Sequence, residues 1–209
     1  MSHNQVADYG WTVEKQVFSN DYLEAAVISA CRSLGVHSLL DLGCGKGDIA
    51  NTLTRSGFSV VGCDADAEGV RIAADAYPQT TFRHLGVYDD PIALGRQGFD
   101  AVISTEVIEH LYAPRALPRF ANKVLKDGGW LIITTPYHGY LKNLALAVGG
   151  HWDRHLTPLW DGGHIKFFSR HTLTRLLEDE GFKVKMFKGV GRAPYFWKSM
   201  LLVAKKEAS

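Results

Sequence analysis

Apolar positions along the chain alternate between short continuous runs and longer stretches with helical spacing. The continuous runs predict strands buried on both faces of a sheet. These strands are expected at VHSLLDL (36–42), FSVVGCD (58–64), TTFRHLG (80–86), FDAVIST (99–105) and WLIITTP (130–136). Helices are expected over 19–35, over 46–57, up to Pro78, and from Pro114 to the Asp127-Gly128-Gly129 turn. This alternation predicts right-handed βαβ units and a parallel sheet with helices on both faces.

The pattern changes after the fifth predicted strand. Residues 137–168 are irregular and rich in His, Trp and Gly, and a helix then follows Ser169 as far as Gly181. KVKMFKGVG and SMLLVAKK come next with no helix between them, which predicts an antiparallel hairpin. We therefore expect an α/β fold with a doubly wound, mostly parallel seven-stranded sheet that ends in a C-terminal antiparallel hairpin.

The predicted organisation is a single domain over residues 1–209 with two additions. Residues 1–35 are expected to form an N-terminal helical lid, in which Tyr9 and Trp11 either cover a ligand or pack under the first helix. Residues 137–168 are expected to form a substrate-facing insertion.

Composition narrows the function classes. A net charge of about +1 gives no global nucleic-acid signal. The N-terminus lacks a signal-peptide pattern, and no apolar run approaches the ~18 residues of a membrane span. Cys31, Cys44 and Cys63 are too few and too far apart for a disulfide framework, so a reduced, cytoplasmic compartment is expected.

The segment LLDLGCGKG carries the strongest local signal. Its glycines lie between a predicted strand and a helix, where they permit a tight turn and close approach of a ligand to the backbone. Asp64 ends the next strand, where an acid can accept hydrogen bonds from both ribose hydroxyls of a nucleoside. Asp48 breaks the GxGxxG dinucleotide pattern. Asp41 would repel a pyrophosphate, but it can meet a cationic amine.

These features resemble class I S-adenosylmethionine-dependent methyltransferases, and the resemblance covers about residues 36 to 206. It implies a Rossmann-like methyltransferase fold with S-adenosylmethionine as cofactor. The glycine loop would hold the methionine part, Asp64 the ribose, and residues 87 and 88 the adenine. Relatives often have an acid where Val87 stands, so adenine recognition is expected to use backbone groups. The implied cofactor residues are Asp41, Gly43, Cys44, Gly45, Gly47, Asp64, Ala65, Val87, Tyr88 and Thr105.

STEVIEH, residues 104–110, places Glu106, Glu109 and His110 after the fourth predicted strand. On a helix these positions would share one face. Ligands of α/β sheets bind at this carboxyl edge, so the three residues are the candidate catalytic residues.

Two groups of methyltransferases resemble this chain most closely. Ubiquinone-biosynthesis O-methyltransferases share the E-x-x-E-H pattern, the Thr135-Pro136 end of strand five, and an H-x-x-F segment, here His164 to Phe167. Small-RNA terminal 2′-O-methyltransferases bind a divalent metal through two acids and two histidines. The corresponding positions here are Glu106, Glu109, His110 and His164, although His151 and His155 lie in the same insertion.

A metal at these positions would chelate a pair of neighbouring acceptor oxygens and favour loss of a proton from one of them. Mg²⁺, Mn²⁺, Fe²⁺ and Zn²⁺ all suit such a ligand set. The alternative is a metal-free site, in which Glu106 orients the segment and His110 acts as a base or lines the pocket.

The leading interpretation is an O-methyltransferase for a small hydroxylated aromatic or quinol-type acceptor. The aromatic insertion would form the acceptor wall, and it is a candidate for peripheral membrane contact although it is short and poorly basic. One alternative is an RNA ribose 2′-O-methyltransferase, which the near-neutral charge disfavours. Another is a non-catalytic binding protein with the same fold. The acceptor's identity and the oligomeric state are left open.

Overall fold

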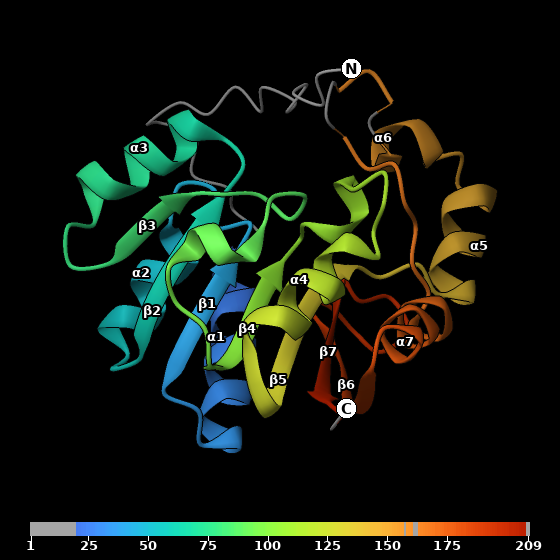
Figure 1. Ribbon diagram of the computed structural model, residues 1–209. Helices are drawn as coiled ribbons and strands as arrows, with labels where there is room; N and C mark the ends of the chain where they lie inside the picture. The colour runs from blue at the N-terminus through green and yellow to red at the C-terminus, as the bar shows by residue number, and fades with distance from the viewer. Residues whose placement is uncertain (1–19, 157, 161–162, 208–209) are drawn as a thin grey trace, which may run out of the picture.

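A seven-stranded sheet runs through the centre of the protein in the order β3-β2-β1-β4-β5-β7-β6 (Figure 1). The computed structural model describes residues 20–156, 158–160 and 163–207. Strands β1 to β5 are parallel, and β7 pairs antiparallel with both β5 and β6. The predicted doubly wound sheet with a C-terminal antiparallel hairpin is confirmed. The strands are Ser38–Leu42 (β1), Ser59–Asp64 (β2), Thr81–His84 (β3), Phe99–Thr105 (β4), Leu125–Pro136 (β5), Phe182–Val190 (β6) and Ser199–Lys206 (β7).

Helices cover both faces of this sheet. The α-helices are Asn20–Leu34 (α1), Asp48–Arg55 (α2), Ala67–Ala76 (α3), Ala116–Val124 (α4), Tyr140–Val148 (α5), Trp152–Leu156 (α6) and Arg170–Asp179 (α7). Short 3₁₀ turns are formed by Pro91–Leu94 (η1) and Ile108–His110 (η2). Side-chain caps fix two helix starts: Asp66 accepts hydrogen bonds from two amides of α3, and Ser169 forms a capping box with Thr172.

The core has two layers because alternate residues of each central strand face opposite sides. Leu39 belongs to the core cluster that includes buried residues of α1, α2 and α3, whereas Leu40 belongs to the cluster that includes buried residues of α4 and α7. Both leucines are fully buried, and each such burial stabilises the fold by about 1.5–3 kcal/mol. The continuous apolar runs of the sequence thus correspond to strands covered on both faces.

The boundary between α4 and β5 differs from the sequence prediction. Helix α4 ends at Val124 instead of the Asp127-Gly128-Gly129 turn, and β5 begins at Leu125. Leu125 pairs with Phe99 and is buried, so strand pairing replaces the helix at that residue. The ladder then shifts register before Trp130, where the predicted strand begins.

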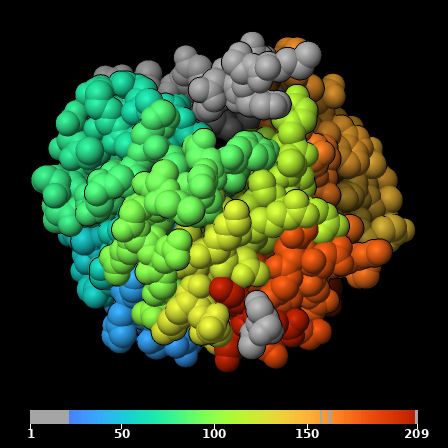
Figure 2. All heavy atoms as spheres, viewed as in Figure 1, coloured from blue at the N-terminus to red at the C-terminus, as the bar shows by residue number. Residues whose placement is uncertain are grey.

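The strand order reverses between β1 and β4, and open α/β sheets bind their ligands outside the carboxyl ends of the strands at such a reversal. Helices α5 and α6 extend from one side of that edge (Figure 1) and form one margin of the molecular surface (Figure 2). Of the predicted N-terminal lid, only the part from residue 20 is described, and it is α1; Tyr9 and Trp11 lie outside the described residues. Among the helices that the structure describes, none is both long enough and apolar enough to cross a bilayer.

Candidate active site

The glycine loop after β1 is packed against β2 and the helix that follows it. The amides of Gly43 and Cys44 both donate to the carbonyl of Cys63, at 2.8 and 3.0 Å. Gly43 has φ of 86° and Gly47 has φ of 80°, a region that favours glycine. A Cβ on Gly47 would overlap the ring of Phe82. The loop conformation therefore requires glycine both for its backbone angles and for its packing.

Asp64 fixes this loop from the end of β2. Its carboxylate accepts hydrogen bonds from the amides of Gly45 and Asp66, both at 2.8 Å. Burial raises the pKa of Asp64, and the hydrogen bonds from the two amides oppose that rise. The acid predicted to bind a ribose thus lies directly beside the predicted methionine loop.

Asp41 lies just before the loop and is completely buried. Neither of its carboxylate oxygens accepts a hydrogen bond from the part of the chain that the structure describes. Burial raises the pKa of Asp41 to about 7, with a further contribution from Asp64. A buried carboxylate without donors is stabilised by a cation, so the residue fits the charged amino group of S-adenosylmethionine.

The remaining predicted cofactor residues line the same strand edge. Ala65 directly follows β2, and its side chain lies beside Gly86, two residues after the end of β3. Val87 packs against the core, while Tyr88 is exposed and its hydroxyl accepts a hydrogen bond from the amide of Ala113 at 3.1 Å. Burial raises the pKa of the Cys44 thiol, so the thiol is neutral at physiological pH. Thr105 is the last residue of β4.

The STEVIEH segment is not an α-helix. Glu106 has left-handed backbone with φ of 54°, and only Ile108–His110 form a 3₁₀ turn. Ile108 is fully buried, and Val107 fills the space that a Cβ on Gly43 would need. These two apolar contacts shape the segment as a tight turn, so the two acids do not share a helical face.

Glu106 is held by hydroxyl groups of two other strands. Thr134 of β5 donates to Glu106 Oε1 at 2.9 Å, and Ser199 of β7 donates to Oε2 at 3.2 Å. Burial raises the pKa of Glu106, while these two hydrogen bonds act in the opposite direction. Tyr22 of α1 extends the network through a 3.0 Å contact with the Ser199 hydroxyl.

Glu109 is fully buried, and only one of its two carboxylate oxygens accepts a hydrogen bond from the described residues. Thr135 donates to its Oε2 at 3.0 Å, whereas Oε1 accepts no hydrogen bond from any described residue. Its main-chain carbonyl accepts hydrogen bonds from the amides of Ile165 and Lys166, both at 2.9 Å. Burial, followed by the charge of Glu106, raises the pKa of Glu109. The main-chain bonds also bring the end of the insertion to the site.

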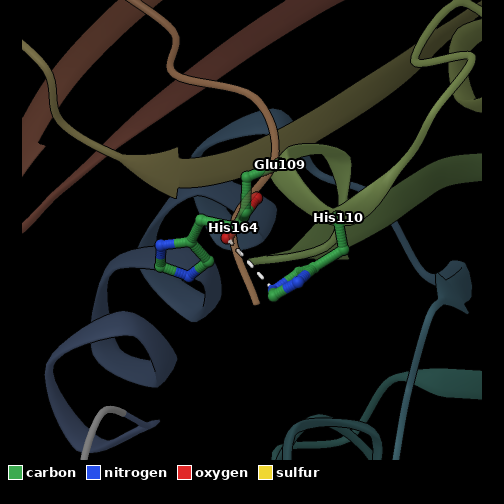
Figure 3. Close-up of side chains that lie close together, drawn as sticks. All are labelled: Glu109, His110 and His164. Carbon is green, nitrogen blue, oxygen red and sulfur yellow. Dashed lines mark ion pairs between the residues drawn. The ribbon is translucent and has the colours of Figure 1, made fainter. Parts of the chain in front are cut away.

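Glu109, His110 and His164 converge from two segments of the chain (Figure 3). One potential ligand atom of each lies within 4.8 Å of those of the other two. Burial and the neighbouring His110 lower the pKa of His164 to about 4, so its imidazole is neutral and can act as a ligand. A carboxylate oxygen that has no hydrogen-bond donor among the described residues, beside a neutral imidazole, fits a divalent cation. Glu106 lies outside this group, so three of the four predicted metal positions come together.

Other polar residues at the site had no clear signal in the sequence. Thr134 and Ser199 hold Glu106, but Ser199 could be found only from the pairing of β5 with β7. His138 is buried against His155 and Phe167, with ring centroids 5.6 and 5.1 Å away. His155 therefore contacts His138 and is absent from the three-residue group.

The sequence of the chain is similar to those of known methyltransferases. The methyltransferase domain family matches residues 20–185. A ubiquinone biosynthesis O-methyltransferase of Cereibacter sphaeroides is 30% identical over 162 residues, which cover 76% of this chain and 65% of that protein. The protein of the same name from Hydrogenovibrio crunogenus is 25% identical over 198 residues, or 91% of this chain and 82% of that protein. The chain thus spans slightly less than two thirds of the Cereibacter relative.

Solved structures show the same fold. Magnesium protoporphyrin IX methyltransferase from Synechocystis, with bound SAH, superposes with a TM-score of 0.65 at 18% identity. The match covers 88% of this chain and 82% of that one.

Proposed function

Because the chain belongs to the methyltransferase domain family, we propose that it transfers the methyl group of S-adenosylmethionine to a hydroxyl of a small aromatic or quinol-type acceptor. One observation carries this proposal: the buried acid–imidazole group after β4 lies at the same sheet edge as the glycine loop and Asp41, whose carboxylate accepts no hydrogen bond from the described residues. The names of the relatives support an O-methyl product.

The cofactor would lie along the carboxyl ends of β1 and β2. Asp41 would hold the amino group of the methionine part, and Asp64 would accept hydrogen bonds from the ribose hydroxyls. Asp64 already orders the loop through Gly45, so the same carboxylate links loop geometry to nucleoside binding. Positioning of the sulfonium beside the acceptor oxygen supplies much of the rate increase.

The acceptor hydroxyl must lose its proton. A phenol has a pKa of about 10, so deprotonation at neutral pH needs help. Oε1 of Glu109 accepts no hydrogen bond from the described residues, and His110 lies beside it, with Nε2 at 4.0 Å. We assign proton removal to this pair.

A divalent cation fits Glu109, His110 and His164, and when bound it would supply a Lewis acid that favours the oxyanion of a catechol-like pair of oxygens. The Thr135 hydrogen bond fixes the other oxygen of Glu109, which leaves Oε1 available. Mg²⁺, Mn²⁺, Fe²⁺ and Zn²⁺ are all compatible with these ligands.

The insertion would form the acceptor wall. Its helix α5 exposes Tyr140, Leu144 and Val148, and Trp160 lies 5.8 Å from the His110 ring between centroids. An apolar outer face beside the site suits a hydrophobic acceptor and peripheral contact with a lipid surface. Sedimentation with lipid vesicles tests that contact, and recovery of all the protein in the supernatant would argue against it.

A radiolabelled methyl-transfer assay tests the proposal. The protein is incubated with labelled S-adenosylmethionine and, in parallel, with catechols, quinol precursors and short RNA. Label in a catechol or quinol supports the proposed function, and EDTA should abolish that transfer until Mg²⁺ or Mn²⁺ is added. Label in RNA alone would make the chain a ribose methyltransferase. Absence of cofactor binding in calorimetry at millimolar S-adenosylmethionine would favour a non-catalytic binding protein.

A further inference from the structure

Lys142 is a buried lysine outside the group of candidate catalytic residues. It is 6% exposed, and it is the only buried side chain of α5. Burial, followed by the charge of Arg192, lowers the pKa of Lys142 to about 8, while Glu106 acts in the opposite direction. A helix normally docks through apolar residues, so a helix whose single buried side chain is a lysine calls for a specific partner of the ammonium group.

The partners are two main-chain carbonyl groups. Lys142 Nζ donates to the carbonyl of Tyr137 at 2.8 Å and to that of Lys198 at 3.4 Å. The amide of Tyr137 also donates to the Lys198 carbonyl, at 3.0 Å. Tyr137 directly follows β5 and Lys198 directly precedes β7, so the ammonium group closes the point at which these two strands separate.

The same strand ends supply the donors that hold both buried acids. Thr135, two residues before Tyr137, donates to Glu109. Ser199, the neighbour of Lys198, donates to Glu106. A shift of either strand end would therefore move a hydroxyl that orients a carboxylate.

We propose that Lys142 is a positioning residue that fixes the acceptor wall and both carboxylates in one arrangement. This role rests on the proposed methyl-transfer function. Lys142 acts through the carbonyls of Tyr137 and Lys198. Among the described residues it donates no hydrogen bond to either acid, so it is not assigned to the chemical step.

Lys206 provides a matched control at the opposite end of the sheet. Its Nζ donates to the carbonyls of Asn122 and Leu125, at 2.7 and 3.1 Å. Lys206 is the last residue of β7, whereas Ser199, which contacts Glu106, is the first residue of the same strand. Lys142→Met and Lys206→Met thus each remove an ammonium group that bridges two carbonyls, but only the first does so beside the acids.

The experiment compares kcat and KM of Lys142→Met, Lys142→Arg and Lys206→Met with the unmodified protein. We expect Lys142→Met to lower kcat by about tenfold to a hundredfold, because misplacement of reacting groups by ~1 Å costs about a hundredfold. Affinity for S-adenosylmethionine should stay within about twofold, Lys142→Arg should recover part of kcat, and Lys206→Met should leave kcat unchanged. Equal loss of kcat in both Met variants, or none in Lys142→Met, would overturn the proposal.

A second readout is independent of methyl transfer. Hydrogen exchange of residues 163–168 reports on the amides of Ile165 and Lys166, which donate to the carbonyl of Glu109. Lys142→Met should raise exchange there, and Lys206→Met should not. Unchanged exchange in Lys142→Met would overturn the positioning role even if no acceptor were methylated. Raised exchange in a protein without transferase activity would sustain that role and reject the proposed function.

Discussion

Ser199, the first residue of β7, donates a 3.2 Å hydrogen bond to the carboxylate of Glu106, 93 residues earlier in the chain. The antiparallel hairpin therefore contributes a side chain to the ligand edge of the parallel strands. The Tyr22 hydroxyl contacts the same serine at 3.0 Å, so α1, β7 and the turn after β4 are connected through one side chain.

Ser199→Ala should destabilise the protein by about 1–3 kcal/mol, because it leaves buried oxygen atoms without a hydrogen-bond partner. The pKa of Glu106 should also rise, since this hydrogen bond favours the ionised acid. Urea denaturation measures the free energy of unfolding. Ser33→Ala is the control, because Ser33 is exposed and its hydroxyl donates to the carbonyl of Ala30 in the same helix. Equal stability of the two variants would contradict the importance of the Ser199 network.

Gly43→Ala should be much more disruptive than Gly57→Ala. Both glycines have left-handed backbone, with φ of 86° and 94°, and this conformation costs an L-residue about 1–2 kcal/mol. Nothing lies near a Cβ on Gly57, whereas Val107 occupies that space at Gly43. Denaturation of both variants separates backbone strain from the steric clash.

Val107→Ala completes a double-mutant cycle with Gly43→Ala. The smaller side chain frees the space next to the glycine loop, so the double variant should recover part of the stability lost by Gly43→Ala. Strictly additive losses in urea denaturation would show that the loop and the turn after β4 are not coupled through this contact.

The glycine loop and the strand-end acid could be predicted because their signals are local. An apolar run followed by glycines marks a strand and its turn, and Asp64 ends the next run. The shape of the STEVIEH segment could not be predicted in the same way. Its residues permit a helix, but the burial of Ile108 and the contact between Val107 and Gly43 are tertiary effects that override the local pattern.

Hydrogen bonds between residues that lie far apart in the sequence could not be predicted either. The antiparallel hairpin was visible as two runs without a helix between them, yet its sequence does not show that β7 pairs with β5. That pairing alone brings Ser199 to Glu106. Lys142 gives a misleading signal, because a lysine on a short helix ordinarily faces solvent.

Asp41 predicts a specific pH dependence. Its pKa is raised from 3.8 to about 7 in the folded protein, so folding favours the protonated acid. The resulting stabilisation is complete below about pH 4 and is lost as the pH rises to about 7, by at most about 4 kcal/mol. Asp41→Asn cannot titrate, so its free energy of unfolding relative to the unmodified protein should increase between pH 4 and pH 8.

Thermal and urea denaturation at pH 4.5, 6 and 8 without cofactor measure this difference. The cost of burying an amide in Asp41→Asn is the same at every pH, so only the slope is informative. Asp75→Asn, at an exposed acid of α3, is the control. Parallel pH profiles for Asp41→Asn and the unmodified protein would rule out a raised pKa at this residue.

Asp64→Ala should weaken S-adenosylmethionine binding by about 1–3 kcal/mol, or roughly 5- to 150-fold in Kd, by loss of charge-assisted hydrogen bonds. Part of the loss arises indirectly, because the Gly45 amide also loses its partner. Calorimetry measures Kd, and Asp75→Asn again serves as the control. Unchanged affinity would exclude Asp64 from the cofactor site.

Glu109→Gln should lower turnover while leaving cofactor affinity nearly unchanged. The amide retains the size of the side chain and an oxygen for the Thr135 hydrogen bond, but it cannot accept a proton or bind a cation as a carboxylate does. General-base catalysis contributes about 10²- to 10⁴-fold, which sets the expected loss in kcat. The affinity for Mn²⁺, measured by calorimetry, should fall together with turnover. Glu178→Gln, which alters an ion pair with Lys183 on the surface, is the control. Full turnover in Glu109→Gln would show that the carboxylate has no catalytic role.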